Sequence, residues 1–241
     1  MAVKKGRQTY ILGMPVSTSL WASSGGKKEG EGPLGKNFDL IFNDSTLGEK
    51  SWEKGESSMI ENTLTALLRK GDLKSSDIDL VIAGDLMNQC TASTYGLRYS
   101  GIPFYGIYGA CSNMGEGISI AALLIESGAF RRICAMTSSH FCTAERQFRF
   151  PLEYGGVKSP TSQWTVTSCA SVLLEAKNKP PFVRAVTIGT VTDLGVKDIS
   201  NMGSAMAPYD VTDTPQKACV YISIRKPRSH EPRGDFFILQ P

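Results

Sequence analysis

Cys111 is the residue of this sequence that best combines a reactive side chain with a functional position. It follows Gly109 and Ala110, between an apolar stretch at 104–108 that predicts a strand and an amphipathic stretch at 112–127 that predicts a helix. This order places the sulfur at a helix N-terminus, where unpaired N–H groups and the helix dipole favour a thiolate or another anion. Burial as a small apolar side chain is the alternative, since free cysteines are among the most buried residues.

Asp85 is the second candidate, because it closely follows an apolar run at 78–83 that is typical of a strand buried on both faces. In open α/β sheets, ligands bind at the carboxyl ends of the strands, which is the edge where Asp85 is expected. The simpler alternative is that Asp85 caps a turn or helix beginning at residues 86–88.

Ser139, His140 and Arg146 come after a predicted strand at 132–137. His140 is the conventional general base of the folded part, although a lone histidine is more often structural. Arg146 lies among the charged and aromatic residues of 145–150, where it suits a clamp for a carboxylate. The alternative for this segment is a solvated loop with internal ion pairs.

The elements that would position these residues alternate between strands and helices. The predicted strands cover 8–12, 78–83, 104–108, 132–137, 164–175 and 182–191, and the predicted helices cover 51–70, 92–99 and 112–127. This alternation indicates an α/β fold with a mainly parallel sheet and a closing antiparallel pair. The glycine-rich segment 25–35 is expected to form a long loop that serves as a lid or an assembly element.

Composition excludes several classes of protein. The 241 residues carry a net charge of +3 without a basic stripe, so no nucleic acid is expected as a partner. The apolar stretch 118–125 is far shorter than the ~20 residues that cross a bilayer, and the interrupted run at 10–16 does not predict a signal peptide. The six cysteines form no C-x-x-C pair, which indicates reduced thiols in a reducing compartment. With two histidines in the chain, we expect no bound metal.

Ordered matches along the chain point to a family. At GACS (109–112) and in the segments around it, the sequence resembles the stage V sporulation protein AD family, thiolase-like proteins of spore-forming bacteria. The other matching segments are GPLG at 32–35, KSWE at 50–53, DIDL at 77–80, AGDL at 83–86, IPF at 102–104, TSSH at 137–140, TAERQFR at 143–149, EYGG at 153–156 and MGSAMAP at 202–208. The resemblance runs from the N-terminus to about residue 208.

This resemblance implies a thiolase-like fold of two similar α/β halves packed in five layers. Residues 1–224 are expected to form the N-terminal α/β half, with the second half largely missing from a truncated chain. Residues 225–241 combine prolines and basic side chains with little regular pattern. We expect this tail to be disordered and outside the family, as a shifted reading frame would produce.

The resemblance also implies a function. Family members are regarded as non-enzymatic proteins that bind dipicolinic acid (pyridine-2,6-dicarboxylate) for its uptake into the developing spore and its release in germination. We therefore expect no cofactor, and binding of this ligand, free or as its calcium chelate, by Cys111, Asp85, Ser139, His140 and Arg146. The expected partners are membrane proteins of the same sporulation operon, at the periphery of the inner spore membrane, with a homodimer for full-length members.

Two other functions stay open at this point. A thiolase-like or ketoacyl-synthase-like acyltransferase would use Cys111 as its nucleophile, with His140 as the sole candidate base. A truncated chain would alternatively act only by docking to membrane components or to a full-length copy.

Overall fold

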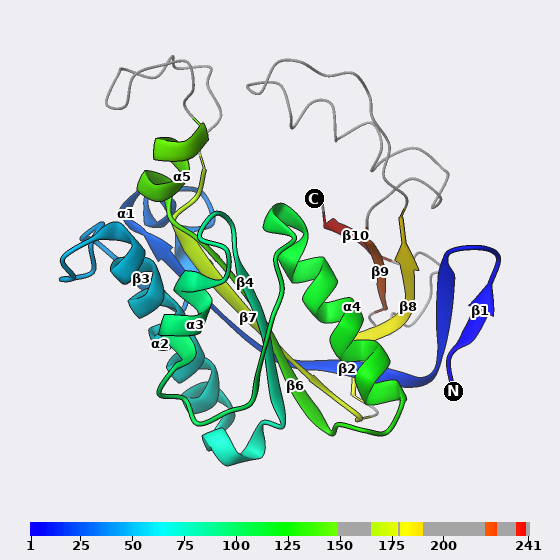
Figure 1. The fold of residues 1–241 in the computed structure, drawn as a ribbon. Helices are drawn as coiled ribbons and strands as arrows, with labels where there is room; N and C mark the ends of the chain where they lie inside the picture. The colour runs from blue at the N-terminus through cyan, green and yellow to red at the C-terminus, as the bar shows by residue number, and fades with distance from the viewer. Residues whose placement is uncertain (149–164, 178, 190–219, 226–234, 240–241) are drawn as a thin grey trace, which may run out of the picture.

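The protein forms a mixed sheet with helices on both faces (Figure 1). The computed structural model describes residues 1–148, 165–177, 179–189, 220–225 and 235–239. The strands are β1 (Val3–Lys5), β2 (Thr9–Gly26), β3 (Leu40–Phe42), β4 (Leu80–Asp85), β5 (Phe104–Gly106), β6 (Arg132–Ser139), β7 (Ser168–Glu175), β8 (Phe182–Ile188), β9 (Val220–Arg225) and β10 (Asp235–Leu239). They follow the order β10-β9-β8-β2-β7-β6-β4-β5, and β1 and β3 both pair with β2.

The parallel part of the sheet lies where the candidate residues are. Strand β4 pairs in parallel with β5 on one side and with β6 on the other. The α/β class and the parallel core predicted from the sequence are therefore confirmed. The described sheet also contains more antiparallel pairing than the predicted closing pair, because β7 and β8 both run antiparallel to the long strand β2.

Strand β2 is much longer than the predicted strand at 8–12. It spans 18 residues and passes through Gly13 and Pro15 without ending. The pairing with β8 shifts register between Ile11 and Val16, so an irregularity in the ladder accommodates both residues. The glycines at 25 and 26, predicted to lie in a long loop, close this strand instead.

The helices connect the strands and cover the sheet. They are α1 (Lys27–Gly30), α2 (Trp52–Gly71), α3 (Thr91–Leu97), α4 (Asn113–Glu126) and α5 (Phe141–Phe148), with short 3-10 turns at Gly35–Asn37, Ser75–Asp77 and Ala110–Ser112. Helix α2 begins at the N-cap Ser51, whose side chain accepts from the Lys54 N–H, and ends at Asp72 in the left-handed region. Among the described residues, no helix combines the length and the apolar composition needed to cross a membrane.

Two apolar cores lie on opposite faces of the sheet, and β4 contributes to both. Leu80 and Ile82 pack into the core beneath α4, whereas Val81 and Ala83 pack into the core beneath α2. This division explains why the run 78–83 is almost continuously apolar: successive side chains of a strand point to opposite faces, and here both are covered.

Part of the C-terminal tail departs from the disorder expected there. Strand β10 lies within residues 225–241 and pairs antiparallel with β9, which in turn pairs with β8. The rest of the tail lies outside the described residues, apart from Arg225 at the end of β9.

Helix α4 should contribute stability through its buried face. Ile125 is 0% exposed in the core beneath α4, so Ile125→Ala is expected to lower the free energy of unfolding by about 2–5 kcal/mol. The matched control is Ile188→Ala in β8, where the side chain is 48% exposed and its loss should cost far less. Urea denaturation of both variants gives the comparison, and equal losses would contradict this packing.

Candidate functional site

Cys111 lies in the 3-10 turn Ala110–Ser112 that leads directly into α4. Its position between β5 and a helix N-terminus is as predicted, and the alternative of a buried apolar cysteine is wrong because the residue is exposed. Ala110 adopts φ +51°, a left-handed conformation that is uncommon for a residue with a Cβ. Such strained turns are concentrated at functional sites.

The helix N-terminus does not make Cys111 a thiolate. Desolvation by the surrounding protein raises the pKa of its thiol, and a backbone hydrogen bond offsets this only in part. The thiol therefore stays protonated at neutral pH. Of the two possibilities raised by the sequence, a site for another anion fits this environment better than an activated sulfur.

Asn113 ties the Cys111 turn to the end of β4. Its Oδ1 accepts the Gly109 N–H at 2.7 Å, and its Nδ2 donates to the Asp85 carbonyl oxygen at 3.0 Å. A Cβ at Gly84 would lie 2.3 Å from the Ile107 carbonyl oxygen and 2.7 Å from the Asn113 side chain. The two segments therefore touch, and glycine is required at the point of contact.

Asp85 is fully buried at the end of β4. Its Oδ2 accepts from both the backbone N–H and the hydroxyl of Ser93, each at 3.2 Å, so Asp85 caps the first turn of α3. Its Oδ1 is also buried and has no hydrogen-bond partner among the described residues. The capping alternative raised by the sequence is thus present, yet it leaves one carboxylate oxygen unused.

Glu56 is a second buried carboxyl at this edge, and it was not among the predicted residues. It is 1% exposed in α2, where Oε1 accepts from the Ser138 hydroxyl and Oε2 from the Asn88 amide, both at 2.8 Å. Burial raises the pKa of Glu56 to about 7; hydrogen bonds from Ser138 and Asn88 oppose this rise, and the charge of Asp85 adds to it. The sequence does carry a signal, because Glu56 lies in helical spacing with apolar core residues three and four positions on.

Ser139 and His140 form hydrogen bonds within the protein. The Ser139 hydroxyl donates to the Val166 carbonyl oxygen at 2.6 Å. His140 is 1% exposed; its Nδ1 accepts the Cys142 N–H at 3.2 Å, and its Nε2 lies 2.6 Å from the Ser45 carbonyl oxygen, to which it therefore donates.

Both ring nitrogens of His140 are thus engaged, as expected of a structural histidine. Burial lowers the pKa of the imidazole, while the Ser45 carbonyl and the charge of Glu29 partly offset that effect. His140 is therefore neutral and anchors the segment around Ser45, which makes it a poor general base.

Arg146 lies in α5, so residues 145–148 of the segment 145–150 are helical and do not form the loop considered as an alternative, while residues 149–150 lie outside the described residues. The side chain of Arg146 lies outside the described part of the chain. Its role as a carboxylate clamp stays a prediction.

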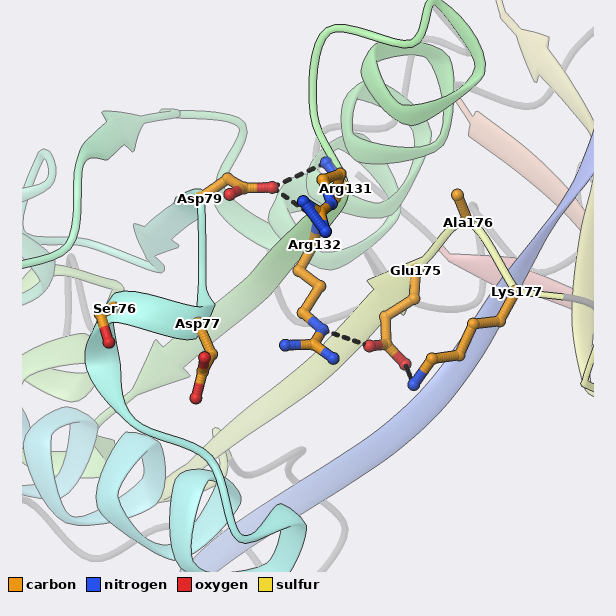
Figure 2. Close-up of a pocket in the computed structure, with 8 residues that line it drawn as sticks. All are labelled: Ser76, Asp77, Asp79, Arg131, Arg132, Glu175, Ala176 and Lys177. Atoms are coloured by element: carbon orange, nitrogen blue, oxygen red, sulfur yellow. Dashed lines mark hydrogen bonds and ion pairs between the residues drawn. The ribbon is translucent and has the colours of Figure 1, made fainter.

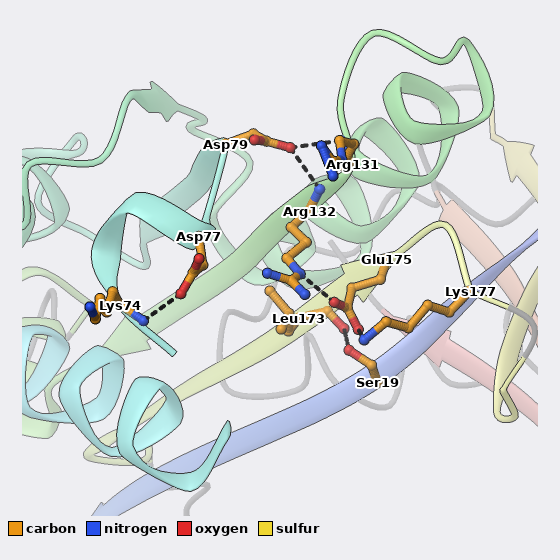
Figure 3. A network of polar contacts seen from close by, with 9 residues as sticks. All are labelled: Ser19, Lys74, Asp77, Asp79, Arg131, Arg132, Leu173, Glu175 and Lys177. Atoms are coloured by element: carbon orange, nitrogen blue, oxygen red, sulfur yellow. Dashed lines mark hydrogen bonds and ion pairs between the residues drawn. The ribbon is translucent and has the colours of Figure 1, made fainter. Parts of the chain in front are cut away.

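A pocket of about 450 Å³ lies at the opposite edge of the sheet, where β4 and β6 begin and β7 ends (Figure 2). Asp79 Oδ2 accepts the backbone N–H groups of Arg131 and Arg132, at 2.7 and 2.8 Å. Glu175 forms ion pairs with Arg132 and Lys177 (Figure 3). None of the predicted site residues lines this pocket.

This network is best explained as a brace for the strand ends. Burial would raise the pKa of Glu175, but hydrogen bonds from Lys177, Ser19 and Arg132 outweigh it and hold the pKa below its usual range. The Glu175 carboxylate is thus charged and paired at neutral pH.

Comparison with known proteins gives matches over most of the chain. The model of the family "Stage V sporulation protein AD (SpoVAD)" matches residues 6–219. Stage V sporulation protein AD of Bacillus subtilis (strain 168) is 41% identical over 203 residues, which is 84% of this chain and 60% of that protein. The chain therefore spans somewhat less than two thirds of the length of this relative.

Solved structures show more distant likenesses. The chain is similar to 3-oxoacyl-[acyl-carrier-protein] synthase III from Aquifex aeolicus, with 16% identity, a TM-score of 0.41, and 53% of this chain and 40% of that one covered. It is also similar to acetamide-bound OleA from Xanthomonas campestris, with 12% identity, a TM-score of 0.45, and 67% and 58% covered.

The two hydrogen bonds of the Asn113 side chain, here called the Asn113 bridge, allow a test of how the Cys111 turn is held against β4. Asn113→Asp keeps the acceptor for the Gly109 N–H but places an oxygen against the Asp85 carbonyl in place of the Nδ2 donor. The variant is expected to lose about 1–3 kcal/mol of stability in a denaturant titration, because a buried acceptor is left without its donor. Asn62→Asp, at an exposed position on α2, is the control and should change stability by no more than about 0.5 kcal/mol. Equal stability of the two variants would show that the bridge is unimportant.

Proposed function

The chain belongs to the stage V sporulation protein AD family, and we propose that it binds dipicolinic acid at the Cys111 turn as a non-catalytic sporulation protein. The observation that carries the proposal is an exposed, protonated cysteine at the start of α4, in a turn fixed against the end of β4. Binding would serve the uptake of dipicolinic acid into the developing spore and its release in germination.

The start of α4 suits a flat ring with two carboxylates. Ser112, the N-cap residue, makes no side-chain cap hydrogen bond, because its hydroxyl donates to the Gly109 carbonyl oxygen instead. The N–H groups of the first helical turn therefore lack a side-chain cap from Ser112, and they attract anions. Arg146, from α5, would hold a second carboxylate.

Acidic residues near this turn favour the calcium chelate over the free dianion. Asp85 lies behind the turn, and Glu116 lies in the first turn of α4. A bare dicarboxylate would meet like charge from both, whereas a one-to-one chelate with Ca²⁺ has a net charge near zero. The chelate is therefore the form that we propose to bind.

Asp85, Ser139 and His140 would stabilise the site without contacting the ligand. Each of these side chains is buried and hydrogen-bonded within the protein. Their proposed contribution is to hold the ends of β4 and β6 in place, while Cys111 and Arg146 contact the ligand.

We base the proposed cellular location and partners of the protein on its family. We propose that it acts at the periphery of the inner spore membrane together with membrane proteins of the same operon. Dimer formation is proposed for full-length members.

Acyl transfer by Cys111 is the second candidate, favoured by the exposure of this residue in a strained turn. Two observations weigh against it: the thiol pKa is raised, and both nitrogens of His140 are engaged elsewhere. A nucleophilic cysteine requires a base within hydrogen-bond reach.

Ligand binding is tested by calorimetric titration with dipicolinate, with and without equimolar calcium. We expect saturable binding that is tighter with calcium, and a loss of about tenfold or more in Cys111→Ala. Ser127→Ala, at the opposite end of α4, is the control and should bind as the wild type does. Absence of saturable binding, or equal affinity of Cys111→Ala and wild type, would contradict the proposal.

The enzymatic alternative is tested separately by incubation with acetyl-CoA and intact-mass measurement. Because the thiol is protonated and lacks a described base, no acyl adduct is expected on Cys111. A stable adduct in the wild type that is absent from Cys111→Ala would instead support acyl transfer.

A further inference from the structure

We propose that Glu56 keeps its proton at neutral pH because it is buried near Asp85 beneath the Cys111 turn, and that Glu56 is thereby a positioning residue for the ligand site. This inference rests on the proposed function and deepens it, because it names the group that sets how ligand affinity changes with pH.

Glu56 and Asp85 come from different elements to the same edge of the sheet. Asp85 and Ser138 are neighbours in the parallel pair of β4 and β6, and the Ser138 hydroxyl donates to Glu56 Oε1. Asn88, three residues after Asp85, donates to Glu56 Oε2. Glu56 is thus held by Ser138, which pairs with Asp85 across the sheet, and by Asn88, which follows Asp85 by three positions.

No positive charge compensates the pair within the described part of the chain. Glu56 is 1% exposed and Asp85 0% exposed, and no ion pair between described residues involves either one. The described residues also contain no group of three or more acidic, histidine or cysteine side chains that would hold a metal ion. Two buried carboxylates without a cation are strongly unfavourable, so protonation of one of them is the way to relieve the charge.

The unpartnered oxygen of Asp85 supports the same conclusion. Asp85 Oδ1 is buried and receives no hydrogen bond from a described residue. Buried polar atoms are nearly always partnered in folded proteins, so an acceptor without a donor leaves the charge of Asp85 poorly compensated and disfavours a second charge on Glu56. Burial raises the pKa of Glu56 to about 7, and the neighbouring charge of Asp85 contributes to that rise.

No other described group around the pair has a pKa that shifts toward neutral pH. These groups are Thr143 from α5, Cys169 from β7, Cys90 before α3, and His140 between β6 and α5. Burial raises the pKa of Cys169 to about 12 and also raises that of Cys90, while burial lowers the pKa of His140. Glu56 is therefore the group whose protonation would respond between pH 6 and 8.

The first test uses the protein without ligand. The pKa of Glu56 is higher folded than unfolded, so its stabilising contribution is full at low pH and is lost as pH rises through about 7. The wild-type melting temperature should therefore fall between about pH 4.5, the ordinary pKa of a glutamate, and about pH 7, and this contribution should level off above pH 7. Glu56→Gln, which is neutral at every pH, should lack this part of the fall. Asn88 can turn its amide to pair with the new Nε2.

Glu61→Gln, on the exposed side of the same helix, is the matched control and should follow the wild-type pH profile. Identical pH profiles in all three proteins would overturn the proposal. The comparison uses the slope with pH, so it holds even if Glu56→Gln is less stable overall.

The second test measures the affinity for free dipicolinate, without calcium, at pH 6 and pH 8, a range in which both ligand carboxyls are ionised and the ligand is a dianion. Ionisation of Glu56 adds negative charge beneath the site, so the wild-type Kd should rise about tenfold and the Kd of Glu56→Gln should stay constant. If the wild type shows the stability profile but binds no dipicolinate, the proposed function fails and the protonation of Glu56 stands. A pH-independent wild-type Kd, or an equal rise in Glu56→Gln, would overturn the link between Glu56 and the ligand.

Discussion

The carboxyl end of β4 is the point on which the packing of this site depends. Gly84 has no space for a side chain, because the Ile107 carbonyl and Asn113 press against it. The carboxylate of Asp85, the next residue, accepts a hydrogen bond from the start of α3, and its carbonyl oxygen accepts one from Asn113 at the start of α4. Both helices therefore begin against one strand end, and the exposed turn with Cys111 takes its position from that contact.

The buried acids at the two edges of the sheet differ in whether they are paired with a cation. Where β6 begins and β7 ends, Glu175 is paired with Arg132 and Lys177 beside an open pocket (Figure 3). At the other edge, Glu56 and Asp85 are buried with hydrogen-bond donors but with no described cation. Charge that is compensated braces a structure over a wide pH range, whereas charge that is buried and uncompensated makes a structure responsive to protons.

Parts of the candidate site could be predicted because their signal is local. The strand, glycine, cysteine and helix around Cys111 follow one another within a few residues, and the structure confirms that order. The role of His140 could not be predicted, since its partner Ser45 lies 95 positions away in the sequence. Glu56 could have been noticed as an acid on the apolar side of a helix, but nothing in the sequence says that Asp85 lies beside it.

By itself, the sequence determined the α/β class, the two-sided burial of β4 and the placement of Cys111 between a strand and a helix. These follow from periodicity and from turn residues, which act over a few positions of the chain. The tertiary structure alone decided that β2 continues past Gly13 and Pro15, that His140 is structural, and that Glu56 and Asp85 are buried at one edge of the sheet without a cation from the described residues. Each of these outcomes depends on hydrogen bonds and packing between distant segments, whose partners come together only when the sheet and its helices have assembled.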